Sequence, residues 1–151
     1  MSDPFEFNQP IQIKATTPAL GKYWKCTDSE GNGEWAVPDF VGLVVSKTGN
    51  YTISDSESGT VFTNEGATGL ITLTLPAAAT QLQFIFVHES TTNGANIKIQ
   101  AASGDTIRIN TTVSSSGGYV QSGQVGETIL LVAINATEWI AISGFGFGTS
   151  G

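Results

Sequence analysis

The feature that most restricts the fold is a regular succession of short apolar segments and turn sequences from about Gly42 onward. Turn-forming groups such as Thr48-Gly49-Asn50 and Ser103-Gly104-Asp105 recur at intervals of roughly 8 to 12 residues, a spacing typical of the strands of a sandwich or barrel. We therefore predict strands near residues 42–46, 50–54, 60–63, 69–75, 83–88, 96–101, 106–110, 118–121, 127–134 and 138–142.

The choice of aliphatic residues supports strands over helices. The chain has 13 Ile and 10 Val against 8 Leu, and β-branched side chains pack well on pleated strands. Apolar and polar residues alternate in several segments; Ile97 and Ile99, for example, flank Lys98. We predict an all-β fold, a jelly-roll-like β-sandwich.

The positions of the prolines and glycines divide the chain. Four of the five prolines lie in the first 38 residues, and proline belongs in extended segments, turns and sheet edges. We predict an extended arm over 1–40, with a hairpin formed by Lys22 to Cys26 and Glu34 to Val37. The sandwich then covers 41–143, and 144–151 form a Gly-rich tail whose Phe145 and Phe147 dock on another surface.

Two predicted strands are apolar on both faces, 84–87 and 129–134. An antiparallel strand with two apolar faces needs a cover on its second face. The sequence leaves two candidates for that cover: a second sheet of the same chain, or another subunit.

The charge pattern excludes several partners. Six basic residues against 13 acidic ones give a net charge of −7, and the basic residues are scattered, which disfavours nucleic acid and an anionic membrane surface. We see no apolar run of the roughly 20 residues that a membrane helix requires, and we expect no secretory signal. The single cysteine, Cys26, cannot form an intrachain disulfide.

The residues that carry catalysis or bind metals are sparse. The single histidine, His88, is interpreted as a strand-end residue satisfied by hydrogen bonds, and Cys26 beside Trp24 as a buried thiol. Asp28, Glu30 and Asn32 have calcium-loop spacing, but strands rather than helices flank them, which favours a solvated hairpin tip. We predict no enzymatic activity, no catalytic residue, no metal and no cofactor.

Several motifs carry a resemblance to a known class of proteins. The segment 21–35 resembles the G-K-x-L-x-x-D-x-x-G-x-x-x-W hairpin of bacteriophage tail-fibre and appendage proteins, with Trp24 in place of the usual aliphatic residue. The run 71–78 is similar to the T-L-P-A motif of small phage β-domains. An N-I-x-I strand at 96–99, a G-D-x-I step at 104–107 and a closing strand before Trp139 follow. The resemblance covers most of residues 21–142.

What the resemblance implies is a non-enzymatic, homotrimeric module on the virion surface. Among such proteins the length favours a capsid decoration (cement) protein over a tail fibre, made in the host cytoplasm and located on the capsid surface. Its partners are then itself and the major capsid protein. We expect the alternating arm residues Phe5, Phe7, Ile11 and Ile13 to anchor it to the capsid, and Phe84, Phe86 and Phe145 to form trimer contacts.

An alternative is a receptor- or carbohydrate-binding module of a tail or head fibre, whose partner is a glycan of the host surface. The aromatic residues Tyr51, Tyr119 and Trp139 and the Ser/Gly-rich loop 114–118 are its candidate site. A glycan-cleaving enzyme is the least favoured of the three hypotheses.

Overall fold

The computed structural model describes residues 23–26, 33–36 and 43–150. The chain divides into two compact units, Met1–Phe40 and Val41–Gly151. In the first unit, β1 (Tyr23–Cys26) and β2 (Gly33–Ala36) pair antiparallel, where the sequence predicts a hairpin. The arm residues Phe5, Phe7, Ile11 and Ile13 and the calcium-like residues Asp28, Glu30 and Asn32 lie outside the described residues.

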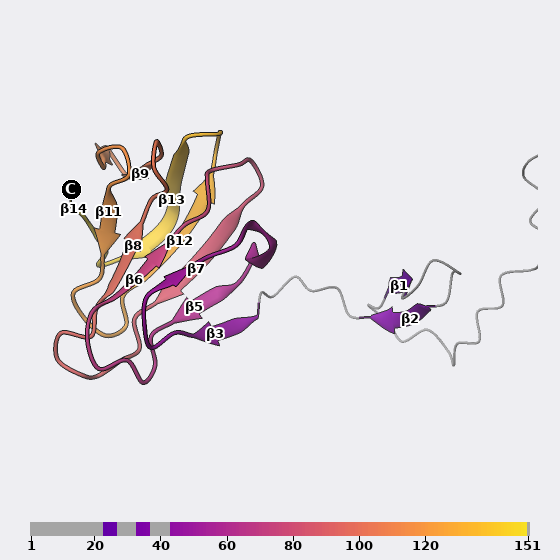
Figure 1. The fold of residues 1–151 in the computed structure, drawn as a ribbon, viewed down its shortest axis with the longest axis horizontal. Helices are drawn as coiled ribbons and strands as arrows, with labels where there is room; N and C mark the ends of the chain where they lie inside the picture. Colours follow the sequence, from indigo (N-terminus) through magenta and orange to yellow (C-terminus); the bar gives the residue numbers. More distant parts are fainter. Residues whose placement is uncertain (1–22, 27–32, 37–42, 151) are drawn as a thin grey trace, which may run out of the picture. The chain divides into compact units, whose positions relative to one another are not determined.

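The second unit is a sandwich of two β-sheets (Figure 1), which confirms the predicted all-β class. The seven-stranded sheet has, in spatial order, β10 (Thr112–Val113), β9 (Thr106–Ile109), β13 (Glu138–Phe145), β12 (Thr128–Ala133), β7 (Gln83–Val87), β5 (Val61–Thr63) and β3 (Val44–Ser46). The five-stranded sheet has β14 (Gly148–Ser150), β11 (Tyr119–Gln121), β8 (Ile97–Gln100), β6 (Ile71–Thr74) and β4 (Tyr51–Thr52). A single 3₁₀ turn, η1 (Asp55–Glu57), follows β4 in the described part of the chain.

The connectivity differs from that of a jelly roll, whose neighbouring strands are antiparallel. From β3 to β9 each strand lies in the opposite sheet from the one before it. A chain that crosses to the other sheet and returns runs in its original direction, so β3, β5 and β7 are parallel neighbours, as are β4, β6 and β8. The first half of the sandwich is therefore a coil with two strands per turn. In the sandwich, antiparallel pairing begins with β10, which pairs with β9, and continues where β11 and β12 join the sheets.

The core lies between the two sheets and is built by period-two alternation. Four aromatic residues occupy its centre, and each is 0% exposed: Phe62, Phe84, Phe86 and Trp139. The ring centroids of three pairs, Phe62–Phe84, Phe62–Phe86 and Phe84–Trp139, are 5.7 to 6.2 Å apart, within the range for favourable aromatic pairs. The facing sheet contributes Ile71, Leu73, Ile97, Ile99 and Val120 to the same cluster.

The C-terminal segment is part of the sandwich and not a separate tail. β13 continues through Phe145, and β14 pairs with β11, so residues after 143 add length and a strand to the two sheets. Phe147 is 8% exposed and belongs to the core. Gly146 makes this turn possible, because its φ is +88° and a Cβ there would overlap the side chain of Glu127.

A buried asparagine connects the loops at one end of the coil. Asn64, 0% exposed, donates from Nδ2 to the carbonyl of Ala95 (2.6 Å) and accepts at Oδ1 from the N–H groups of Glu89 (2.7 Å) and Ser90 (3.0 Å). One side chain thus satisfies three backbone groups that the strands leave unpaired.

Replacing Asn64 with alanine should therefore destabilise the sandwich. The loss leaves three backbone groups without this partner, and we expect the free energy of unfolding in urea to fall by about 2 to 4 kcal/mol. Asn93→Ala, at an exposed loop position, is the control and should change it by less than about 0.5 kcal/mol. Equal effects of the two substitutions would contradict a structural role for the Asn64 amide.

Candidate functional site

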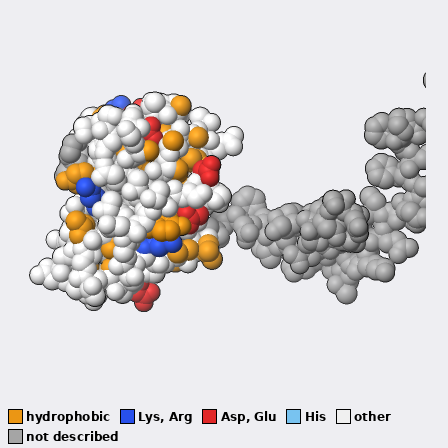
Figure 2. Space-filling view, viewed as in Figure 1, with side chains coloured by type: hydrophobic (Ala, Val, Ile, Leu, Met, Phe, Trp, Pro, Cys, Tyr) orange, Lys and Arg blue, Asp and Glu red, His pale blue; other side chains and the backbone are white. Residues whose placement is uncertain are grey.

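The outer face of the seven-stranded sheet carries a group of apolar side chains, which ends beside the ion pair of Arg108 and Glu138. The strand register aligns Val44, Val61, Ile85 and Leu130 in one row across β3, β5, β7 and β12. We define the apolar face by the outward-pointing aliphatic and aromatic residues on this sheet: Val44, Val61, Ile85, Val87, Leu130, Val132, Ile140 and Phe145. Figure 2 shows hydrophobic side chains, with charged ones among them, over the part of the domain where β3 and β5 lie.

The ends of the apolar face are its most accessible parts. Val44 on β3 is 64% exposed and Phe145 on β13 is 75% exposed, whereas the central strands bear half-buried side chains. A register shift between Leu130 and Leu131 leaves Ile142 without a partner on β12, and Ile142 is 61% exposed. Val44, Ile142 and Phe145 therefore expose apolar area of the kind that marks association surfaces.

The structure separates the three residues predicted for trimer contacts. Phe145 lies on the apolar face, but Phe84 and Phe86 are fully buried in the core and have no surface to offer a second subunit. The prediction for these two residues is therefore wrong. The alternation of β7 turns their neighbours Ile85 and Val87 outward instead.

The outer face of the five-stranded sheet has the opposite character. The register aligns Thr52, Thr74, Gln100 and Tyr119 in one row across β4, β6, β8 and β11, and Thr72, Lys98 and Gln121 in the next. We call these seven residues the polar face. Its one charged side chain, Lys98, places its Nζ 4.0 Å from the ring centroid of Tyr119.

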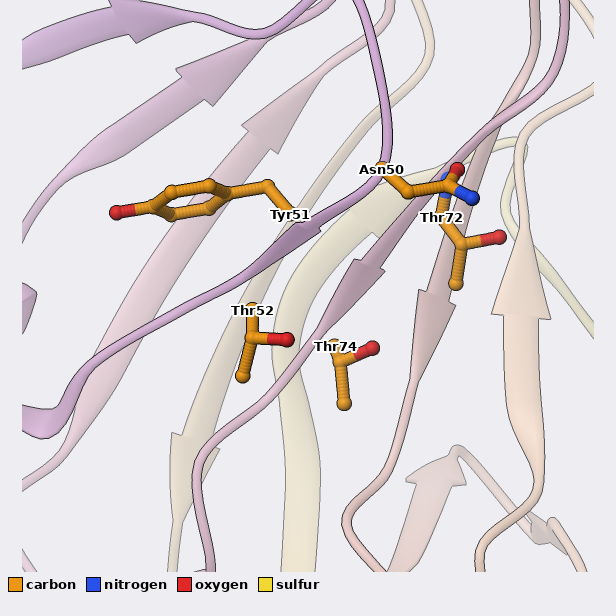
Figure 3. A pocket seen from close by; sticks show the side chains of 5 residues that line it. All are labelled: Asn50, Tyr51, Thr52, Thr72 and Thr74. Carbon is orange, nitrogen blue, oxygen red and sulfur yellow. The ribbon is translucent and has the colours of Figure 1, made fainter.

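A shallow pocket of about 270 Å³ lies at the β4 edge of the polar face, lined by Asn50, Tyr51, Thr52, Thr72 and Thr74. In Figure 3 the ring of Tyr51 points away from the other four side chains. Asn50 is fixed because its Oδ1 accepts the backbone N–H of Thr72 at 2.8 Å. The side chains in the pocket are therefore three hydroxyl groups and one amide, all uncharged.

The three aromatic candidates for carbohydrate binding lie in different environments. Tyr119 is on the polar face, whereas Trp139 is 0% exposed in the core, so its assignment as an exposed binding residue is wrong. The Tyr51 hydroxyl donates to Glu57 Oε1 at 2.9 Å, and Lys47 Nζ lies 3.3 Å from its ring centroid. That hydrogen bond, with burial and the Glu57 charge, raises the pKa of Tyr51 above its ordinary value.

The loop 114–118 packs beside Tyr119. Its Ser114 Oγ accepts the N–H of Ile107 at 2.9 Å, and Gln100 Nε2 donates to the carbonyls of Gly117 and Gly118. These bonds connect the loop to β9 and β8. They also orient Gln100, which the sequence analysis did not select because an isolated glutamine in a strand carries no distinctive signal.

The described part of the chain holds no group of three or more His, Cys, Asp or Glu residues placed to bind a metal ion. In the same residues no helix has the length and apolarity needed to cross a membrane. His88 is 3% exposed, and within the described residues neither ring nitrogen has a hydrogen-bond partner. The expectation of a hydrogen-bonded histidine is therefore wrong, because the side chain is buried with both ring nitrogens unpartnered among the described residues.

Comparison with known proteins adds no family: no protein-family model matches the chain, and no curated protein matches it.

The unpaired imidazole predicts an unusual mutational response. His88→Leu removes two buried polar atoms without breaking a hydrogen bond to a described residue, so it should leave the free energy of unfolding unchanged or raise it by about 1 kcal/mol. Thermal and urea unfolding measure the effect, with His88→Asn, which retains a polar group, expected to destabilise. A loss of about 2 kcal/mol or more in the leucine variant would contradict this account.

Proposed function

We propose that the protein is a structural component of a bacteriophage virion: a homotrimeric capsid decoration protein that binds and stabilises the major capsid shell. The observation that carries the proposal is the apolar face, with Phe145 at 75% and Val44 at 64% exposure. Extended apolar patches on soluble domains mark surfaces for association. The resemblance of several motifs to phage β-domains supports a location on the capsid surface.

Self-association is energetically reasonable for a face of this kind. Burying one Val, Leu, Ile or Phe side chain fully contributes about 1.5 to 3 kcal/mol, and association costs roughly 4 to 15 kcal/mol in lost freedom. The eight residues of the apolar face are already partly covered, so each contributes less than the full value. The largest contributions come from Phe145 and Val44, the two most exposed members of the apolar face.

The proposal assigns different tasks to the two units of the chain. In it, the sandwich forms the trimer through the apolar face, with Ile85 and Val87 in the place first given to Phe84 and Phe86. The arm residues Phe5, Phe7, Ile11 and Ile13 bind the major capsid protein by adding a strand to its sheet. No catalytic step is part of this function.

Sedimentation velocity tests the trimer. We expect the wild-type protein to sediment as a trimer, and Phe145→Glu and Leu130→Glu to shift it to a monomer, because each places a charge in an apolar contact. Val125→Glu is the matched control, since Val125 is 53% exposed but outside the apolar face. A monomeric wild type, or a trimer that survives both substitutions, would overturn the assignment of this face.

Cosedimentation with purified phage capsids tests the arm. Deleting residues 1–20 should abolish binding to expanded capsids and leave the thermal unfolding of the sandwich unchanged. Full binding by the shortened chain would show that residues 1–20 are not needed for capsid binding.

The second candidate is a receptor- or carbohydrate-binding module of a tail or head fibre. The polar face favours it, because uncharged hydroxyl and amide groups lie in register beside an aromatic ring. Immunogold labelling of virions distinguishes the two settings: label on heads supports decoration, and label on tails supports the fibre module.

A further inference from the structure

The geometry points to a specific ligand site: we infer that the polar face binds a neutral oligosaccharide, which lies along the row Thr52, Thr74, Gln100 and Tyr119 with one end in the pocket at β4. The inference gives the glycan-binding candidate a site and a ligand class. It does not depend on the proposed trimer, because the apolar face belongs to the other sheet.

The chemistry of the pocket indicates an uncharged ligand rich in hydroxyl groups. Thr52, Thr72 and Thr74 each offer a hydroxyl that both donates and accepts, and Asn50 offers amide N–H groups. No charged side chain lines the pocket. An anionic ligand would also approach a chain of net charge −7, with Lys98 as the one cation on the polar face.

The length of the row indicates an oligosaccharide and not a single sugar. Neighbouring strands are about 4.8 Å apart, so Tyr119 on β11 is roughly 14 Å from Thr52 on β4. A ligand that reaches both the pocket and the aromatic ring must span four strands. The strand register keeps every member of the row on the same side of the sheet.

Several side chains of the polar face and its pocket are held in place before any ligand binds. Lys98 lies over the Tyr119 ring, Gln100 Nε2 donates to the carbonyl of Gly118 at 3.2 Å, and Asn50 accepts from the Thr72 backbone. Restrained side chains lose less conformational entropy on binding. This arrangement favours recognition even though the pocket is shallow.

Tyr119 and the threonines of the row make different kinds of contact with the oligosaccharide. Lys98 covers one face of the Tyr119 ring; the rest of the ring provides apolar area against which the C–H face of a sugar packs, and the hydroxyl provides a polar contact. The threonine row supplies hydrogen bonds that fix orientation. Each site alone is expected to bind weakly, and several copies held together would raise the overall avidity without new contacts.

A glycan array tests the inference with the full chain as the probe protein. The array carries neutral hexose and N-acetylhexosamine oligosaccharides, with sialylated and sulfated glycans for comparison. We expect binding to a neutral oligosaccharide of two or more units that persists at high salt, because no charge pairing contributes. Binding confined to sialylated or sulfated glycans, or to none, would overturn the inference.

Variants then locate the site by calorimetric titration with the strongest neutral oligosaccharide of the array. Thr52→Val and Thr74→Val keep the side-chain shape and suit a strand, and each should weaken affinity by a factor of about 2 to 10, the loss of one hydrogen bond. Tyr119→Ala should abolish measurable binding. Thr106→Val is the matched control, a half-buried threonine on β9 of the other sheet, and should bind as the wild type does.

Two further comparisons make the outcome unambiguous. Equal affinity of Thr74→Val and Thr106→Val, with both folded by thermal unfolding, would place the glycan elsewhere and overturn the site. The trimer-disrupting Phe145→Glu should retain the wild-type affinity per chain, so failure of the proposed assembly and failure of the glycan site give different results.

Discussion

The packing of Phe62, Phe84, Phe86 and Trp139 between the two sheets is the constraint on which the rest of the sandwich depends. These side chains are fully buried and in mutual contact, and they fix which face of β5, β7 and β13 points inward. Side chains alternate along a strand, so a slip of one residue would turn Phe84 and Phe86 to the outside and bring Ile85 and Val87 in. The aromatic cluster therefore selects the register, and the register determines what both outer faces present.

The strand register determines which side chains lie on the two outer faces, and these faces differ in chemistry. On the seven-stranded sheet the outward positions of β7 and β12 are mainly aliphatic, with Gln83 and Thr128 as the exceptions, and Ile85 lies next to Leu130 on the surface. On the five-stranded sheet the outward positions of β6 and β8 are Thr72, Thr74, Lys98 and Gln100. An assembled particle needs one surface for contact between subunits and another that tolerates solvent, and the proposed functions assign these tasks to the apolar and the polar face.

The sequence predicts the positions of the strands closely because local signals determine them. Alternation at 71–75 and 97–99, bounded by turn residues, corresponds to β6 and β8. It does not predict the parallel coil, because a turn sequence marks where a strand ends and says nothing about which sheet receives the next one. The sequence also does not determine which face of β7 points into the core, because both faces are apolar. For this reason the sequence places Phe84 at an interface and the structure places it in the core. The Gly-rich sequence after Ser143 has the composition of a tail, yet the freedom of Gly146 lets the chain turn and form β14.

The coil explains how a candidate site arises from residues that are distant in the sequence and individually unremarkable. Each turn of the coil adds one strand to the five-stranded sheet in the same direction, so Thr52, Thr74 and Gln100 come into line across parallel strands. The antiparallel β11 then closes the row with Tyr119 opposite Gln100. No single motif contains these four residues, because their relation is one of register between strands and not of spacing along the chain. A flat array of aligned side chains is what parallel pairing produces, and here the array is uncharged except at Lys98, whose ammonium lies over the Tyr119 ring. The parallel coil is therefore the physical origin of the polar face.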